Sequence, residues 1–194
     1  MGIPAAVKAL RTFAKADPIA NDTETLEALE NEIFNTSDRV TAVMLGAAVE
    51  TALERLLASR MRQDLSRTEQ DQLFGFEGAV GTFSGKIMVA YAMSIIGPIT
   101  YSDLKFIKEL RNQFAHSRVV FDFQTSQVAA VCNELKTPRL PDSNNSFKSR
   151  IKTEKSASWM LFVSACHNIL YRMIVKQHGP RAGDIVFVND EPLP

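Results

Sequence analysis

Apolar side chains recur at every third or fourth position along two long stretches of this chain, residues 39–61 and 154–178. This spacing places the apolar groups on one face of an α-helix, so each stretch predicts a long amphipathic helix. Residues 42–49, within the first stretch, are apolar on nearly every side of the predicted helix. Such a helix needs packing partners all around it. The sequence therefore predicts an all-α bundle with a long buried central helix.

Shorter apolar patterns between capping and breaking residues predict further helices. These segments are residues 3–16, 21–34, 66–73, 84–96, 101–116 and 126–135. Thr100 and Asp103 have the spacing of a capping box at the start of the segment at 101–116. Gly97-Pro98 is expected to end the helix before it, since proline disrupts a helix interior.

Two short runs of β-branched and aromatic residues, 119–123 and 185–188, are candidates for extended segments. Both are too short and too isolated to imply a sheet. No internal repeat or linker divides the chain. We therefore expect a single domain of roughly five to eight helices over residues 1–178, followed by a tail at residues 179–194.

Composition narrows the class of protein. The chain has 22 Lys and Arg residues against 22 Asp and Glu residues, so its formal net charge is zero. This balance argues against a protein that coats long nucleic acid by bulk charge, although a short basic cleft is compatible with it. No stretch approaches the ~18 uncharged apolar residues of a membrane span. The first sixteen residues lack the pattern of a signal peptide. We expect a cytoplasmic protein that does not enter the membrane.

The cysteines and histidines suggest no metal site. Cys132 and Cys166 each lie within an apolar helical pattern, which predicts two buried thiols and no disulfide, as suits a reducing compartment. His116, His167 and His178 are scattered along the chain and form no ligand cluster. We expect neither a metal nor a cofactor.

The strongest candidate site is the run Leu110-Arg111-Asn112-Gln113-Phe114-Ala115-His116, at the predicted end of a helix. A guanidinium such as that of Arg111 holds a phosphate in a bidentate fork. An imidazole such as that of His116 takes a proton from a ribose 2′-hydroxyl or delivers one to a leaving 5′-oxygen. Asn112, four residues before His116, shares its helix face and would orient either group. This chemistry needs no metal, because the 2′-hydroxyl is the nucleophile.

The same residues also have structural interpretations. A histidine at the C-terminus of a helix is expected on electrostatic grounds, because its cationic form complements the helix dipole. Arg111 would then form a surface salt bridge with Glu109 or Asp103. Glu50, which interrupts the apolar surface of the central helix, would be solvated at its edge or would point towards a site.

A longer segment carries a family resemblance. It comprises Leu73-Phe74-Gly75-Phe76, Gly81-Thr82-Phe83-Ser84-Gly85-Lys86-Ile87, Ala90-Tyr91-Ala92 and Ile107-Lys108-Glu109 up to His116, preceded by the helix Gly46-Ala47-Ala48-Val49-Glu50-Thr51-Ala52-Leu53-Glu54-Arg55-Leu56-Leu57. Together these residues resemble the mannitol operon repressor family over about residues 39–120. The ending Arg-Asn-x-Phe-Ala-His also resembles the signature of the wider HEPN group of helical proteins.

The resemblance implies a fold and a set of roles. HEPN proteins are typically dimeric bundles of four or five helices. Many are metal-independent ribonucleases of toxin–antitoxin and phage-defence systems, and others are not catalytic. Carried onto this chain, the resemblance implies that Arg111 contacts phosphate, Asn112 supports it and His116 is the catalytic base or acid. Glu50, on the neighbouring helix, is expected to face the motif.

Three functions remain open at this point. The first is a HEPN-like endoribonuclease or RNA-binding regulator, a homodimer with two copies of Arg111 and His116 near its interface. The second is a non-enzymatic transcriptional regulator that works through protein contacts, as the mannitol-repressor relatives are described. No helix pair with a basic recognition face is evident for DNA binding. The third is a helical scaffold in which Arg111 and His116 only tie helices together.

Overall fold

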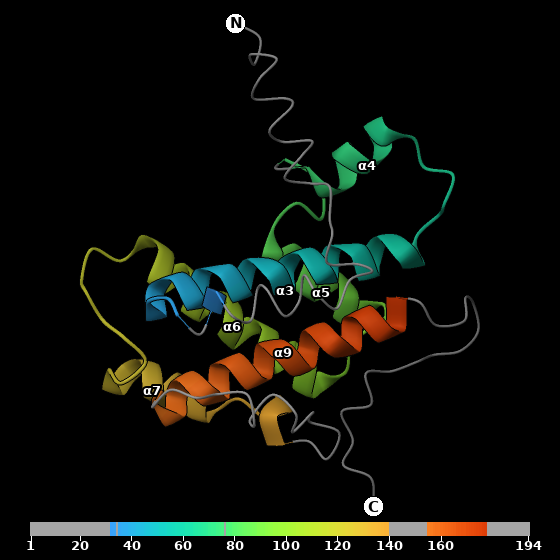
Figure 1. Cartoon of the computed structure of the whole chain (residues 1–194). Coiled ribbons are helices and arrows are strands. Elements are labelled where there is room, and N and C mark those ends of the chain that lie inside the picture. Colours follow the sequence, from blue (N-terminus) through green and yellow to red (C-terminus); the bar gives the residue numbers. More distant parts are fainter. Residues whose placement is uncertain (1–31, 34, 76, 140–154, 178–194) are drawn as a thin grey trace, which may run out of the picture. The chain divides into compact units, whose positions relative to one another are not determined.

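The computed structural model of the chain describes residues 32–33, 35–75, 77–139 and 155–177 (Figure 1). By its internal contacts the chain divides into two units, Met1–Thr36 and Ser37–Pro194. The expected helix at 3–16, most of that at 21–34, the extended run at 185–188 and the tail at 179–194 lie outside the described residues.

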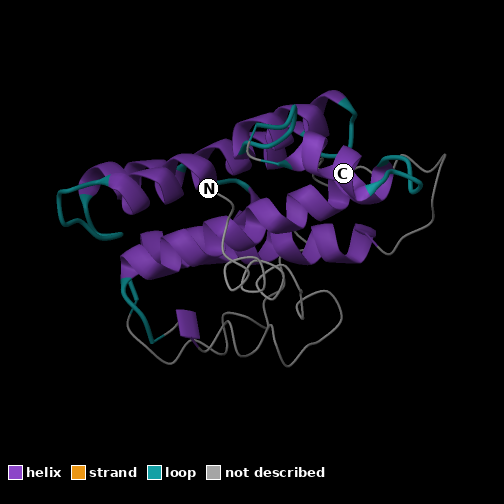
Figure 2. Cartoon of the chain, turned by 90° about the horizontal axis from the view of Figure 1, so that it is seen from above, coloured by secondary structure: helices purple, strands orange, loops and turns teal. Residues whose placement is uncertain are grey.

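The unit Ser37–Pro194 is all-α in its described part, as the sequence predicts. Figure 2 shows helices and loops there and no strand. The elements are α3 (Asp38–Arg60), α4 (Arg67–Phe74), α5 (Phe83–Ala92), α6 (Pro98–His116), α7 (Ser126–Asn133), the 3₁₀ turn η2 (Thr137–Arg139) and α9 (Ala157–Gln177). None of the described helices combines the length and apolar character required to cross a membrane.

Helix α3 is the long central helix that the sequence predicts. It packs against α5, α6 and α9, and Figure 1 shows α9 running alongside it. Ser37 caps its start by accepting a hydrogen bond from the Val40 amide. Its buried residues are Thr41, Ala42, Leu45, Gly46, Val49, Leu53, Leu56 and Leu57. Ala47 is exposed, so one side of the apolar stretch lies against no described element.

Residues 119–123 fold back onto the core without forming a strand. The Phe123 amide donates a hydrogen bond of 2.9 Å to the Asp38 carboxylate at the start of α3. The Phe123 ring lies 5.0 Å from that of Phe114 on α6 and 5.2 Å from that of Phe162 on α9. The two ring contacts and the hydrogen bond to Asp38 join three helices through one loop residue, while Val120 at the loop tip is 93% exposed.

Helix α5 ends at Ala92, four residues before the predicted end at residue 96. Ser94 adopts a φ of 56°, in the left-handed region. The next amide, that of Ile95, donates back to the Ala90 carbonyl at 2.9 Å. This 6→1 bond closes the helix in the manner of a Schellman motif. The turn therefore ends α5 before the breaking pair Gly97-Pro98.

The predicted capping box of Thr100 and Asp103 is wrong. Helix α6 begins earlier, at Pro98, whose fixed φ suits the first helical position, and Gly97 is the N-cap. Asp103 therefore lies beyond the first turn and is fully buried. Its carboxylate accepts hydrogen bonds from the Lys136 amide, from the Thr137 amide at 2.7 Å and from the Thr137 hydroxyl. Asp103 thus ties α6 to η2.

Replacing Asp103 with asparagine is expected to lower the free energy of unfolding by about 2–3 kcal/mol, because charge-assisted hydrogen bonds to buried donors are lost. Urea denaturation at pH 7 measures the change. Glu109→Gln, at an exposed position of the same helix, is the control and should shift stability by less than about 0.5 kcal/mol. Equal unfolding midpoints for the two variants would contradict this role of Asp103.

Candidate functional site

The run from Leu110 to His116 forms the C-terminal turns of α6. His116 is the last helical residue, and the Ser117 amide closes the helix on the Gln113 carbonyl. Beyond it, the guanidinium of Arg39 on α3 donates to the carbonyls of Ser117, at 3.3 Å, and Val119, at 3.2 Å. The chain leaving the motif is therefore held against the start of α3.

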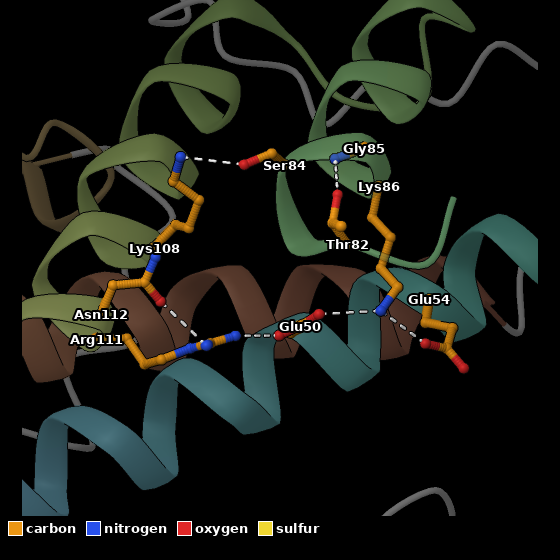
Figure 3. Close-up of polar contacts among 9 residues, drawn as sticks. All are labelled: Glu50, Glu54, Thr82, Ser84, Gly85, Lys86, Lys108, Arg111 and Asn112. Atoms are coloured by element: carbon orange, nitrogen blue, oxygen red, sulfur yellow. Dashed lines mark hydrogen bonds and ion pairs between the residues drawn. The ribbon is translucent and has the colours of Figure 1, made fainter. Parts of the chain in front are cut away.

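Arg111 forms an ion pair with Glu50 of α3, as Figure 3 shows. Glu50 thus faces the motif, as expected. The other terminal nitrogen of Arg111 donates to the Asn112 side-chain oxygen at 3.0 Å. The salt bridges proposed to Glu109 and Asp103 are wrong, because Glu109 accepts from the Gln113 amide group at 2.7 Å and Asp103 is occupied by η2.

Lys86 of α5 completes the cluster and was missed as a site residue. Its ammonium lies 3.0 Å from Glu50 and 2.9 Å from Glu54, and its side chain is only 5% exposed. Two cations, Lys86 and Arg111, thus balance two carboxylates. The sequence contained a clue to this role. Lys86 lies next to Ile87, on the side of α5 that also buries Phe83 and Ala90. A charge on an apolar face requires a partner.

The carboxylates keep Lys86 charged. Burial lowers the pKa of Lys86, but hydrogen bonds and charge interactions with Glu54 and Glu50 outweigh that effect, so its pKa lies above the ordinary value. A raised lysine pKa contributes stability that is fully present below the unfolded-state pKa and is lost as pH rises through the folded-state pKa. Lys86 therefore stays charged at neutral pH, and its contribution to stability is lost as pH rises through its raised pKa.

Gly46 explains how Arg111 fits between the helices. A Cβ atom at residue 46 would lie 2.6 Å from Cγ and 2.7 Å from Cβ of Arg111, which is closer than carbon atoms can approach. Glycine therefore lets α6 approach α3. The guanidinium carbon lies 5.7 Å from the centre of the Phe83 ring. The buried Nε of Arg111 has no hydrogen-bond acceptor among the described residues.

Asn112 contacts this cluster, whereas His116 does not. The two residues are four positions apart, so they share one face of α6. Asn112 accepts a hydrogen bond from Arg111 through its side-chain oxygen, so its NH₂ group is not used in that contact. His116 is exposed, and no hydrogen bond or ion pair joins it to Arg111 in the described part of the chain. The structure brings together Glu50, Arg111 and Asn112, and leaves His116 one turn further on.

The two cysteines are buried, as the sequence predicts. Cys132 and Cys166 are both buried and unbonded to each other. Burial raises the pKa of the Cys132 thiol to about 12 and that of Cys166 well above its ordinary value, so both are unreactive at neutral pH. Among the described residues, no group of three His, Cys, Asp or Glu side chains is placed to hold a metal ion.

Comparison with known proteins adds no relative. No family model, no curated protein and no solved structure matches the chain. The geometry of the residues around Arg111 is therefore the basis for a functional argument.

Gly46→Ala is expected to destabilise the protein by about 1–2 kcal/mol, because the added methyl group overlaps Arg111 and forces the helices apart. An unobstructed helix would instead gain up to ~1 kcal/mol from the same change. Gly85→Ala is the matched control, since its added Cβ meets nothing closer than the Thr82 hydroxyl at 3.2 Å. Thermal and urea unfolding compare the variants, and a Gly46→Ala protein as stable as the Gly85→Ala protein would disprove the close approach.

Glu50→Gln is expected to cost about 2 kcal/mol or more, because Arg111 and the buried Lys86 lose the carboxylate that they share. Glu54→Gln should cost less than about 1 kcal/mol, since Glu54 is 40% exposed and Lys86 keeps Glu50. Chemical denaturation at pH 7 measures both. Equal losses would mean that Glu50 does not hold the cluster together.

Proposed function

We propose that this chain is a metal-independent endoribonuclease of the HEPN type, working as a homodimer. The observation that carries the proposal is the arrangement at the end of α6. The exposed side chain of His116 lies one turn beyond Asn112 on the same face of α6, and Arg111, which donates to Asn112, is held by Glu50. A proton-transfer group, a hydrogen-bond donor and a cation within two helical turns suit RNA cleavage.

In the proposed reaction, His116 takes the proton of a ribose 2′-hydroxyl. The 2′-oxygen attacks the adjacent phosphorus atom, and the bond from phosphorus to the 5′-oxygen breaks. The leaving 5′-oxygen receives a proton from a protonated imidazole, which the dimer supplies as His116 of the partner subunit. The products are a 2′,3′-cyclic phosphate and a 5′-hydroxyl. The donor on Asn112 stabilises the charge that develops on the phosphate.

Lys86 supports the role of Arg111 in this scheme. Arg111 is paired with Glu50 in the free protein, so it must exchange partners to reach a phosphate. Glu50 also accepts from Lys86 at 3.0 Å, and it therefore keeps a cation when Arg111 moves. Without Lys86 the exchange would leave an unpaired, partly buried carboxylate, which is costly.

A second candidate is a non-enzymatic regulator resembling the mannitol repressor. The engagement of Arg111 favours it, because both terminal nitrogens have partners within the chain. In that case the Glu50–Arg111 pair only ties α3 to α6. Val119 and Val120, which are 68% and 93% exposed directly after α6, would then offer an apolar contact for a protein partner.

The nuclease is tested with single-stranded RNA in the presence of EDTA. His116→Ala is expected to lower the cleavage rate by at least ~100-fold, since general acid–base catalysis contributes roughly 10²–10⁴-fold. Gln113→Ala, an exposed neighbour on the same helix, should retain wild-type activity. An RNA with one 2′-deoxy position should resist cleavage at that position.

Product ends distinguish this activity from a contaminant, because the reaction must leave a cyclic phosphate and a 5′-hydroxyl. No product from the wild-type protein, or equal product from the wild-type and His116→Ala proteins, would exclude the enzyme and favour the regulator.

A further inference from the structure

Five residues of α6 form a continuous stripe along its outer side. Tyr101, Lys105, Lys108, Asn112 and His116 are spaced by four, three, four and four positions. At 100° per residue they fall within an arc of about 80°, and at 1.5 Å per residue the stripe is about 22 Å long. We call this set the α6 stripe. It leads from the start of α6 directly to Asn112 and His116 of the candidate site.

Helix α5 lies beside the α6 stripe and runs antiparallel to α6. The Lys108 ammonium donates to the Ser84 hydroxyl at 3.1 Å, as Figure 3 shows. Tyr91 stacks on Tyr101 with ring centres 4.3 Å apart. Because Ser84 begins α5 and Tyr91 nears its end, these two contacts place Met88 midway along the stripe. Met88 is 54% exposed and Tyr91 is 41% exposed.

The combined surface is cationic and aromatic. The Lys105 ammonium lies 5.3 Å from the centre of the Tyr101 ring. Neither Lys105 nor Lys108 forms an ion pair with a described carboxylate. The sequence of α5 contains no acidic residue. Within α6, Asp103 is buried and Glu109, at the edge of the stripe, is bonded to Gln113.

We propose that this α5–α6 face binds a single strand of RNA and guides it to His116. The inference rests on the proposed function and names the surface that the substrate occupies. Lys105 and Lys108 neutralise phosphates, while exposed parts of Met88 and Tyr91 contact bases. Unpaired bases offer ring faces to such a platform, whereas the bases of a duplex are stacked on one another. A local basic surface of this kind is compatible with a chain of zero net charge.

Binding is measured separately from cleavage with a fluorescein-labelled 2′-O-methyl RNA oligonucleotide, which lacks the nucleophilic hydroxyl. Fluorescence anisotropy gives the affinity at several salt concentrations. The double variant Lys105→Gln/Lys108→Gln is expected to bind at least tenfold more weakly. Its slope of log affinity against log salt should be shallower by about 1.4, since each phosphate contact contributes about 0.7 for single strands.

Tyr91→Ala is expected to weaken binding roughly tenfold with an unchanged salt slope, because it removes a stacking surface and no charge. Lys136→Gln and Tyr171→Ala are the matched controls, since these are an exposed lysine and an exposed tyrosine on other parts of the chain. Both controls should bind within twofold of the wild-type protein. Circular dichroism verifies that each variant is folded.

Cleavage of the unmodified RNA by the wild-type protein is assayed in parallel. Binding that depends on the face, without cleavage, supports this inference and overturns the proposed nuclease. Cleavage with equal affinity in wild-type and variant proteins overturns this inference alone. Absence of binding by the wild-type protein overturns it as well. Analytical ultracentrifugation measures whether each variant is a dimer. If the double variant loses a dimer that the wild-type protein forms, but binds RNA with unchanged affinity, the face contacts a second copy of the chain, and the inference is overturned.

Discussion

The contact between Gly46 of α3 and the stem of Arg111 of α6 is the constraint on which the rest of the described structure depends. A Cβ atom at residue 46 would lie 2.6 Å from Cγ of Arg111, so the two helices meet at this distance only through a glycine. The approach brings the guanidinium to Glu50, and Glu50 also accepts from Lys86 of α5. Three helices thus converge on one carboxylate.

Charge balance makes this convergence possible. Lys86 is 5% exposed, and an ammonium at such a depth without partners would be strongly destabilising. Two carboxylates surround it, and Arg111 restores neutrality to the group of four. Partly buried ion pairs contribute little net stability compared with apolar packing, but removing one member is costly. The cluster therefore acts mainly to define how α3, α5 and α6 align.

The helical period divides α6 into a structural side and a chemical side. Arg111 points towards α3, whereas Asn112, one position later and rotated by 100°, continues an outer stripe that ends at His116. The hydrogen bond from Arg111 to Asn112 links the two sides. A change in the partner of Arg111 would therefore alter the hydrogen bonding of Asn112, near the exposed end of the helix. This link connects the ion-pair cluster to the proposed cleavage site and to the proposed RNA surface.

The sequence by itself determined the helices, because apolar spacing and capping residues are local properties. The expected segments at 39–61 and 66–73 match α3 and α4 within one residue, and the buried centre of α3 follows from its composition. The same spacing put Asn112 and His116 on one face. Departures from these expectations had two causes, a long-range contact at Asp103 and an unrecognised local turn at Ser94. Asp103 left its predicted cap for the amides of η2, and Ser94 ended α5 early through a left-handed turn.

Only the tertiary structure decided which helix faces meet. A periodic pattern of apolar residues indicates that a helix has a buried side, but it does not indicate which other helix packs against that side. The partner of Arg111, the burial of Lys86 between Glu50 and Glu54, and the requirement for glycine at position 46 all depend on pairs of residues at least 32 positions apart, such as Glu54 and Lys86. Such distances are set by packing, since each close contact must satisfy the volumes and charges of several helices at once.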